Sequence, residues 1–424
     1  MMIPRYGWIG TMALIIAITA QTAQAGGIMS YEIATPEVGL ASAGTAARAQ
    51  DAATLFTNPA GMTRLPRPEM MASLQMAYGY TKFSPNTNTG PQTGGDGGNG
   101  AGWLPGGSLF YVHPLSSDFA FGVGTLTYFG GIIDYRDTWA GRYFVQSSTL
   151  LGVTIMPSIA FRVSDWLSLG AGLNAMYGMY ENEVAINNLA VDYDGRLKIK
   201  DTEWGYGGDF GILIMFNDAT RLGLTYLTKV DLDFSDTPKF YDLGPGLTTI
   251  LDSRGLLTAG LDLSMSVPET FMLSFYHELN EDLALLANVG WQDWSSFGEV
   301  DIGIRSDDPT SLTVDKNYED TWHVALGGQY RLDRDTLLSA GIAYDSSMVK
   351  DRNRTPDLPV GETWRFGLGS QFGLEDNVRF GLAYAFMWSG DLRMDQSGTL
   401  SGRLAGKYRN ASYHFLSANV RWLF

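Results

Sequence analysis

Apolar and polar residues alternate along much of the chain, most regularly near its C-terminal end. In the last segment one face carries Leu416, Ala418, Val420, Trp422 and Phe424, and most of the other carries Ser417, Asn419 and Arg421. The same period of two recurs over residues 322–332 and 364–372. Since successive side chains of a strand point to opposite faces, each segment predicts a β-strand with one apolar and one polar face. A soluble β-sandwich also alternates, but these segments are long, aromatic residues cluster toward their ends, and the polar face is rich in glycine, which favours a transmembrane barrel.

Short polar turns alternate with long loops between the predicted strands. Six turns, rich in Asn, Asp and Ser, lie at residues 116–118, 164–165, 217–219, 280–282, 333–335 and 375–377. Such side chains bond the local backbone and suit tight turns. Seven long loops cover roughly residues 84–104, 131–148, 182–195, 235–255, 301–317, 351–360 and 390–410. Strict alternation of short and long connections predicts an all-β, antiparallel up-and-down barrel of about 14 strands, from residues 68–83 to residues 411–424.

The N-terminal residues 1–25 have the pattern of a secretory signal peptide. Arg5 provides a positive start, Trp8 to Ala20 is apolar, and Ala23-Gln24-Ala25 matches an A-x-A cleavage site. The apolar run is shorter than the roughly 20 residues of a transmembrane helix. A buried helix of a cytosolic protein is the alternative. We therefore expect export, cleavage before Gly26 and localisation in the outer membrane of a Gram-negative cell.

Residues 26–65 precede the first predicted strand and contain an Ala-rich, helix-compatible stretch from Leu40 to Phe56. Ala favours helix, and the following Asn58-Pro59 ends it. Fourteen strands enclose a lumen that side chains alone do not fill. We therefore predict that residues 26–65 form a partly helical hatch that plugs the lumen of a barrel formed by residues 66–424. The alternative is a periplasmic tail.

Composition narrows the class further. The chain has 424 residues, a formal charge of −16 and no Cys, and its mean hydropathy is −0.05. No later segment is apolar for long enough to form a helical span, whereas alternating barrel strands average to near neutral. The acidic balance argues against a nucleic-acid partner, and the absence of Cys excludes a disulfide framework.

Enzyme motifs are weak. The four His residues are scattered without metal-ligand spacing, and no G-x-S-x-G elbow occurs. Residues 95–100 match G-x-G-x-x-G but lie in a Gly- and Asn-rich loop with no helix to follow. We therefore expect no metal, no cofactor and no enzymatic activity. An outer-membrane lipolytic enzyme and a general diffusion porin are the rival hypotheses.

Three segments carry a family resemblance. The segment Ala46–Gly61, with Asn58-Pro59-Ala60, resembles the N-terminal hatch of the FadL/TodX family of outer-membrane transporters. Residues 267–270 and 291–297 are similar to the family's Pro-Glu … Trp-Ser-x-Phe region, and Pro356-Asp357 precedes the strand of residues 364–373. The resemblance spans the mature chain in order.

The resemblance implies uptake of hydrophobic molecules by facilitated diffusion. Long-chain fatty acids are the first substrate class expected, and monoaromatic hydrocarbons, as for TodX-like channels, are the alternative. The family route starts at the extracellular loops, passes the hatch and leaves sideways through a kink in the third strand. The implied partners are this hydrophobic ligand, outer-membrane lipid, lipopolysaccharide and the barrel assembly machinery, for a monomeric protein.

Residues suited to each step can be named. The hatch candidates are Leu55, Phe56, Asn58, Pro59 and Ala60. Three apolar residues lie in a predicted loop: Trp139, Tyr143 and Phe144. They could capture substrate, or they could pack on neighbouring loops. The candidate kink, or else an ordinary strand end, comprises Phe129, Gly130 and Gly131. Three residues have lumen-facing positions: Arg365, Arg379 and His323. They could bind a carboxylate, or they could form ion pairs with acidic neighbours such as Asp345.

Overall fold

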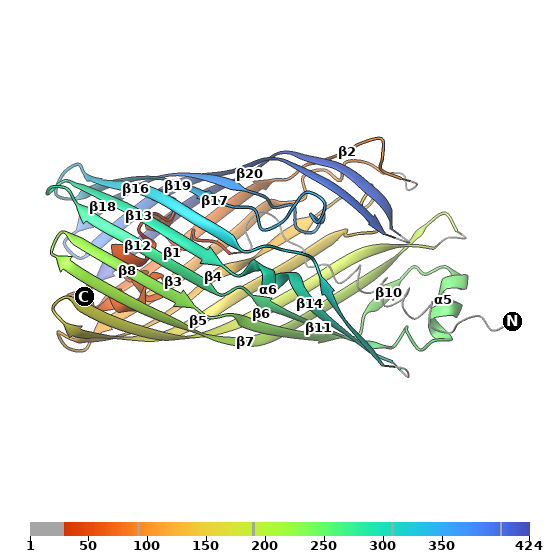
Figure 1. Ribbon diagram of the computed structural model, residues 1–424, viewed down its shortest axis with the longest axis horizontal. Coiled ribbons are helices and arrows are strands. Elements are labelled where there is room, and N and C mark those ends of the chain that lie inside the picture. Colours follow the sequence, from red (N-terminus) through yellow and green to blue (C-terminus); the bar gives the residue numbers. More distant parts are fainter. Residues whose placement is uncertain (1–28, 91–93, 189–190, 307–308, 399–400) are drawn as a thin grey trace.

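The structure is a computed structural model that describes residues 29–90, 94–188, 191–306, 309–398 and 401–424 (Figure 1). The predicted signal peptide lies outside these residues. Within them, fourteen antiparallel strands form a closed barrel, because the first strand pairs with the last. The strands are β1 (Glu69–Tyr80), β3 (Gly102–Pro114), β4 (Phe119–Asp134), β5 (Ser147–Ser164), β6 (Leu167–Asn187), β7 (Asp194–Asn217), β8 (Thr220–Leu227), β12 (Thr270–Glu278), β13 (Leu283–Gln292), β16 (Thr321–Arg331), β17 (Thr336–Asp345), β18 (Thr363–Glu375), β19 (Val378–Gly398) and β20 (Gly402–Leu423). Among the described residues, no helix combines the length and apolar character needed to cross a membrane.

The predicted alternation is confirmed. On β16 the side chain of Trp322 is 55% exposed and that of Leu326 is also exposed, whereas His323 between them is 2% exposed. On β20 Leu416 is exposed, while Ser417 and Asn419 are buried. Apolar residues therefore cover the outside of the barrel, where lipid takes the place of a core, and polar residues line the lumen.

All six predicted turns join neighbouring strands at the end of the barrel that also holds the C-terminus (Figure 1). The predicted loop boundaries are less accurate. Within the predicted loop 390–410, β19 continues to Gly398 and β20 begins at Gly402, and the two strands pair there, with Asp395 bound to Arg403 and Asp391 to Lys407. The sequence pattern missed these strand extensions because their outward faces carry charged residues. Beyond the lipid, the outward face of a strand no longer needs to be apolar.

The two longest loops fold into a second sheet instead of remaining irregular. Its strands, in the order β15, β14, β11 and β9, are β15 (Thr310–Asp315), β14 (Glu299–Arg305), β11 (Gly260–Val267) and β9 (Val230–Asp236). The apolar face, including Leu232, Phe234 and Ile302, is buried over the barrel mouth. The shorter elements of the loops are β2 (Phe83–Pro85), β10 (Lys239–Tyr241), α5 (Pro245–Asp252) and α6 (Trp294–Gly298).

The hatch lies inside the barrel, as predicted, and its helices appear in red between the strands of Figure 1. It comprises α2 (Thr35–Gly39), α3 (Thr45–Arg48), α4 (Thr54–Thr57) and the 3-10 helix η1 (Pro59–Arg64). The expected helical stretch from Leu40 to Phe56 is thus broken into short pieces. Positive φ angles at Ala41, Ser42 and Ala49 reverse the chain, so that each piece can contact a different part of the wall.

Candidate functional site

The predicted Asn-Pro-Ala turn is buried between the hatch and the barrel wall. Asn58 donates from Nδ2 to the carbonyl oxygens of Ala46 (2.6 Å) and of Ile212 on β7 (3.0 Å), and its Oδ1 accepts from the amide of Ala60 (3.1 Å). Three bonds from one side chain join two parts of the hatch to the wall. Pro59 has no amide hydrogen and begins η1, where none is needed.

Lumen-facing glycines allow the hatch backbone to touch the wall. A Cβ atom on Gly223 would lie 1.9 Å from the carbonyl oxygen of Ala46, and one on Gly341 would lie 1.8 Å from that of Leu40. A Cβ on Gly211 would lie 2.1 Å from Asn58 Oδ1. The glycine-rich inner face noted in the sequence is therefore the docking surface of the hatch.

Buried charges fasten the hatch, and sequence reasoning missed them. Arg48 binds Glu37 (2.7 Å) and Asp51 (2.5 Å). Burial alone would raise the pKa of Asp51, but the adjacent Arg48 guanidinium holds it below its ordinary value. Glu69 on β1 accepts from the amide of Ala52 (2.7 Å) and from Arg421 on β20 (2.8 Å). The hatch is thus tied to the two strands that close the barrel.

The third barrel strand, β4, contains an irregularity at the predicted kink. Its register with β5 shifts between Thr127 and Phe129, which leaves Tyr128 as an extra, bulged residue. Gly130 has a φ of +133°, and a Cβ there would lie 2.3 Å from the carbonyl oxygen of Leu150. Because β4 continues to Asp134, the strand-end alternative is wrong.

Between the short turn and the β4 bulge, β3 and β4 pair from Pro114↔Ala120 to Ser108↔Leu126. On the loop side of this stretch the two strands no longer pair with each other. Residues 102–107 of β3 pair with β1, and residues 127–134 of β4 pair with β5, with Tyr128 bulged out. The two sides meet again where the amide of Asp134 donates to the carbonyl oxygen of Gly100 (2.7 Å). We call the intervening stretch, in which the described residues of β3 and β4 form no ladder, the wall gap.

The residues just before the hatch helices cover the wall gap from inside. Met29 bridges to Phe129, the amide of Ser30 donates to the carbonyl oxygen of Tyr128 (2.8 Å), and Ser108 Oγ on β3 donates to the carbonyl oxygen of Ile33 (2.8 Å). The N-terminal segment, residues 29–34, therefore spans both edges of the gap. Backbone groups at membrane depth need such partners.

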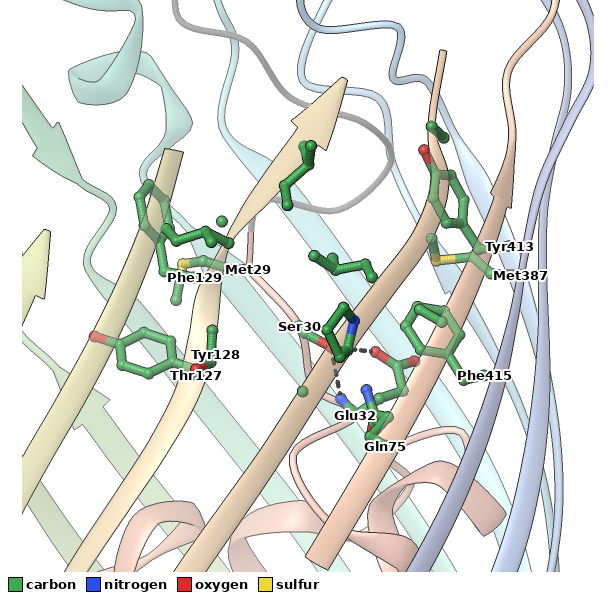
Figure 2. A pocket seen from close by; sticks show the side chains of 18 of the residues that line it. Met29, Ser30, Glu32, Gln75, Thr127, Tyr128, Phe129, Met387, Tyr413 and Phe415 are labelled. Carbon is green, nitrogen blue, oxygen red and sulfur yellow. Dashed lines mark hydrogen bonds between the residues drawn. The ribbon is translucent and has the colours of Figure 1, made fainter. Parts of the chain in front are cut away.

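A cavity, here called the lumen cavity, lies beside the N-terminal segment (Figure 2). Thr127, Tyr128 and Phe129 lie on one side of it, and Met387, Tyr413 and Phe415 on the other. A second cavity lies next to it and shares Met29, Arg365 and Met387 with it. Trp294, Met348 and Val360 also line this second cavity. The two cavities are thus neighbours, one beside the wall gap and the other beside the loops.

The three predicted carboxylate-contact residues do not form one site. Arg365 binds Glu32 of the N-terminal segment (2.5 Å) and Asp345 (2.6 Å), and His323 Nδ1 lies 2.7 Å from the same Asp345. These two form the lumen ion-pair network that was the alternative. Arg379 lies elsewhere, near the short-turn end of β19, in register with Gly373 and Arg421.

Of the two alternatives for Trp139, Tyr143 and Phe144, the structure shows packing on neighbouring loops, because all three side chains are buried. Trp139 stacks on Tyr135 with ring centroids 3.9 Å apart, and its indole donates to the carbonyl oxygen of Val145 (2.9 Å). The loop packs on its neighbours. Exposed apolar side chains occur instead at Tyr193, Tyr241 and Ile250, around β10 and α5 at the far loop end (Figure 1).

A buried cation near the barrel mouth was missed by sequence reasoning. Lys316 Nζ lies 3.8 Å from Oδ2 of Asp357, and both side chains are buried in the loops. Burial lowers the pKa of Lys316 and raises that of Asp357, and the attraction between the two opposes both shifts. The nearby hydroxyl of Tyr180 has no hydrogen-bond partner among the described residues. Only the folded loops bring these groups together.

Comparisons with known proteins agree with this architecture. The chain is 28% identical to outer membrane protein P1 of Haemophilus influenzae Rd over 89% of each sequence. It is 23% identical to the long-chain fatty acid transport protein of Escherichia coli K12, over 97% of this chain and 96% of that protein.

Solved structures share the fold. A Pseudomonas aeruginosa FadL homologue superposes with a TM-score of 0.85 at 23% identity, over 94% of this chain and all of the other. The Pseudomonas putida toluene transporter TodX has a TM-score of 0.69 at 17% identity, over 95% and 99%. The family described as outer membrane protein transport protein (OMPP1/FadL/TodX) matches residues 16–424. The chain therefore belongs to the OMPP1/FadL/TodX family of outer-membrane proteins, whose members are transport channels for hydrophobic molecules.

Proposed function

We propose that this protein takes up long-chain fatty acids by facilitated diffusion and releases them sideways into the outer membrane. The observation that carries the proposal is the pair of neighbouring cavities, one of which lies at the wall gap behind the N-terminal segment. An apolar chain that leaves there enters lipid without crossing the aqueous periplasm. The hatch residues 55–60 hold the plug in place, and cofactors and an energy source are unnecessary.

The path begins at the exposed apolar residues Tyr193, Tyr241 and Ile250, because exposed apolar patches mark interaction sites. It continues through the second cavity, past Trp294 and Met348, to the lumen cavity. The N-terminal segment then moves, which breaks the short pairing of Met29 and Ser30 with β4. The Ser108–Ile33 hydrogen bond, the Glu32–Arg365 ion pair and the packing of Tyr31 against His323 also oppose this movement, whereas the barrel itself stays closed.

A carboxylate-bearing ligand is favoured over a neutral hydrocarbon by the buried Lys316. Lys316 is buried beside Asp357, with Nζ 3.8 Å from Oδ2, and a ligand carboxylate could compete with Asp357 for this charge. A fatty-acid carboxylate could accept from both Lys316 and the Tyr180 hydroxyl. Uptake of monoaromatic hydrocarbons remains the second candidate, favoured by the structural likeness to TodX.

Competition binding tests the proposal. Purified protein in detergent should bind oleate, and excess toluene should displace it weakly. Cells without the protein should grow poorly on oleate as sole carbon source. Binding of toluene with no measurable binding of oleate would transfer the proposal to the hydrocarbon class, and a steady open-channel conductance with neither ligand bound would contradict both.

The β4 bulge provides a separate prediction. Gly130→Ala places a Cβ against the carbonyl oxygen of Leu150 and a side chain at a φ of +133°, a strain of about 1–3 kcal/mol. We expect the bulge to relax and oleate uptake to fall, while oleate binding and heat-modifiable migration in SDS persist. Gly246→Ala, where a Cβ meets open space, is the matched control. Equal uptake by both variants would show that the bulge has no part in release.

A further inference from the structure

The lipid-facing surface of the barrel is hollowed beside the wall gap. Small residues occupy outward positions on three adjacent strands, namely Ala418 on β20, Ala72 on β1 and Gly107 on β3. Larger apolar side chains also line the depression: Leu74, which is 77% exposed, stands in register between Ala418 and Gly107, and Leu109 is in register with Ala72. The depression has a volume of about 580 Å³, within the range typical of ligand sites. We call it the outer hollow.

The outer hollow and the lumen cavity lie on opposite faces of the same thin part of the wall. Thr127 lines both of them, and Gly106 lines the cavity while its neighbour Gly107 lines the hollow. The last paired rung between β3 and β4, Ser108↔Leu126, contributes both residues to the hollow. A chain that passes through the wall gap therefore arrives directly in the hollow.

We propose that the outer hollow is a binding site for the hydrocarbon chain of the departing ligand. This inference rests on the proposed lateral release and adds a receiving site on its lipid side. The surface of the hollow is mainly apolar, with Phe380 and Val153 among its lining residues, although Ser and Thr side chains and Asn419 also line it. A chain that lies there keeps apolar contact on the protein side while its other side meets lipid, so it never exposes hydrocarbon to water.

The position of the hollow beside the lumen cavity points to its occupant. An ordinary lipid chain can cover the outward-facing residues of the hollow, but Thr127 lines the lumen cavity as well. A ligand chain that leaves the lumen through the wall gap passes this residue before it meets lipid. The hollow should therefore contact the ligand chain during transport more often than it contacts a chain of bulk lipid.

The experiment fills the hollow from the lipid side. Ala418→Phe and Ala72→Leu place bulk in it without touching the lumen. Ala287→Phe is the matched control, because its neighbours in register, Phe275 and Leu326, are exposed on a distant part of the wall. We expect both hollow variants to reduce oleate uptake several-fold, with oleate binding and heat-modifiability unchanged, and the control to resemble the parent.

Photo-crosslinking distinguishes the occupants. A diazirine-bearing palmitate added outside cells should label residues 107–109 and 125–127, and Ala418→Phe should abolish this labelling. A diazirine phospholipid in the membrane should label the exposed face near Leu326 at least as strongly as the hollow. Labelling of the hollow by phospholipid alone, or normal uptake in both hollow variants, would overturn the site. If the parent protein itself did not bind oleate, the proposed function would be overturned instead.

Discussion

Removal of residues 29–60 is expected to change the barrel from a nearly silent protein into an ion-conducting pore. The hatch fills a fourteen-stranded lumen that side chains alone leave open. The barrel should still fold, because its strand ladders close through β1 and β20 without any hatch residue. Arg221 and Glu69, which now bind hatch backbone, would face water in the open lumen and could be hydrated there.

Planar-bilayer conductance is the measurement for this deletion. We expect steady, stepwise currents from the deletion variant and near silence from the parent, together with loss of selective oleate uptake. Asn58→Ala should act in the same direction but less strongly, because it removes the bonds to Ala46 and Ile212 and leaves the buried charges in place. Migration of unboiled protein in SDS checks that each barrel is folded. A folded deletion variant as silent as the parent would show that the segment is not a plug.

Neutralising the buried cation should weaken oleate binding by about tenfold to a hundredfold, since a hydrogen bond to a charged group contributes about 1.5–3 kcal/mol. Replacing Lys316 alone would leave Asp357 buried without its counter-ion, which is destabilising. The informative variant is therefore the double substitution Lys316→Met with Asp357→Asn, which removes both charges and preserves the volume of both side chains approximately.

Oleyl alcohol provides the internal control for this experiment, because it has the same chain without the carboxylate. Its affinity should be unchanged in the double variant, so that the ratio of the two affinities falls. Lys350→Met is the matched control, since that lysine is 57% exposed and binds only Glu319 at the surface. Equal losses for oleate and oleyl alcohol would indicate a structural effect, and no loss for either would mean that the carboxylate binds elsewhere.

Local chemistry explains which parts of the fold were predictable. The turn at Asn280-Glu281-Asp282 depends on Asn280, whose Oδ1 accepts from the amides of Asp282 and Leu283 (both 2.9 Å). The strand at residues 321–331 needs only a period of two, because lipid outside and a polar lumen inside impose it at every strand. Both signals lie within a few residues, so neither depends on the rest of the molecule.

Above the membrane the same signals failed. Residues 391–395 alternate between polar and apolar as in a spanning strand, but Leu392 and Met394 pack inward on loop residues while Asp391 and Asp395 point to solvent. The same ambiguity affected Trp139, whose apolar surface indicated a ligand site until Tyr135 was found stacked on it. An apolar residue needs a partner, and the sequence does not state whether the partner is a ligand or another loop.

By itself, the sequence determined the barrel, its strand number and the alternation of its turns and loops, because these follow from periodicity and turn chemistry that are local along the chain. It also indicated the plug, because a strand-free, Ala-rich segment precedes a barrel whose lumen side chains alone do not fill. Only the tertiary structure decided where the plug touches the wall, that Glu32 joins Arg365, that Lys316 lies beside Asp357 and that β3 and β4 part beside a hollow. These features depend on residues up to hundreds of positions apart. Their energies come from burial and from matched shapes and charges, which exist only once the barrel has closed around the hatch.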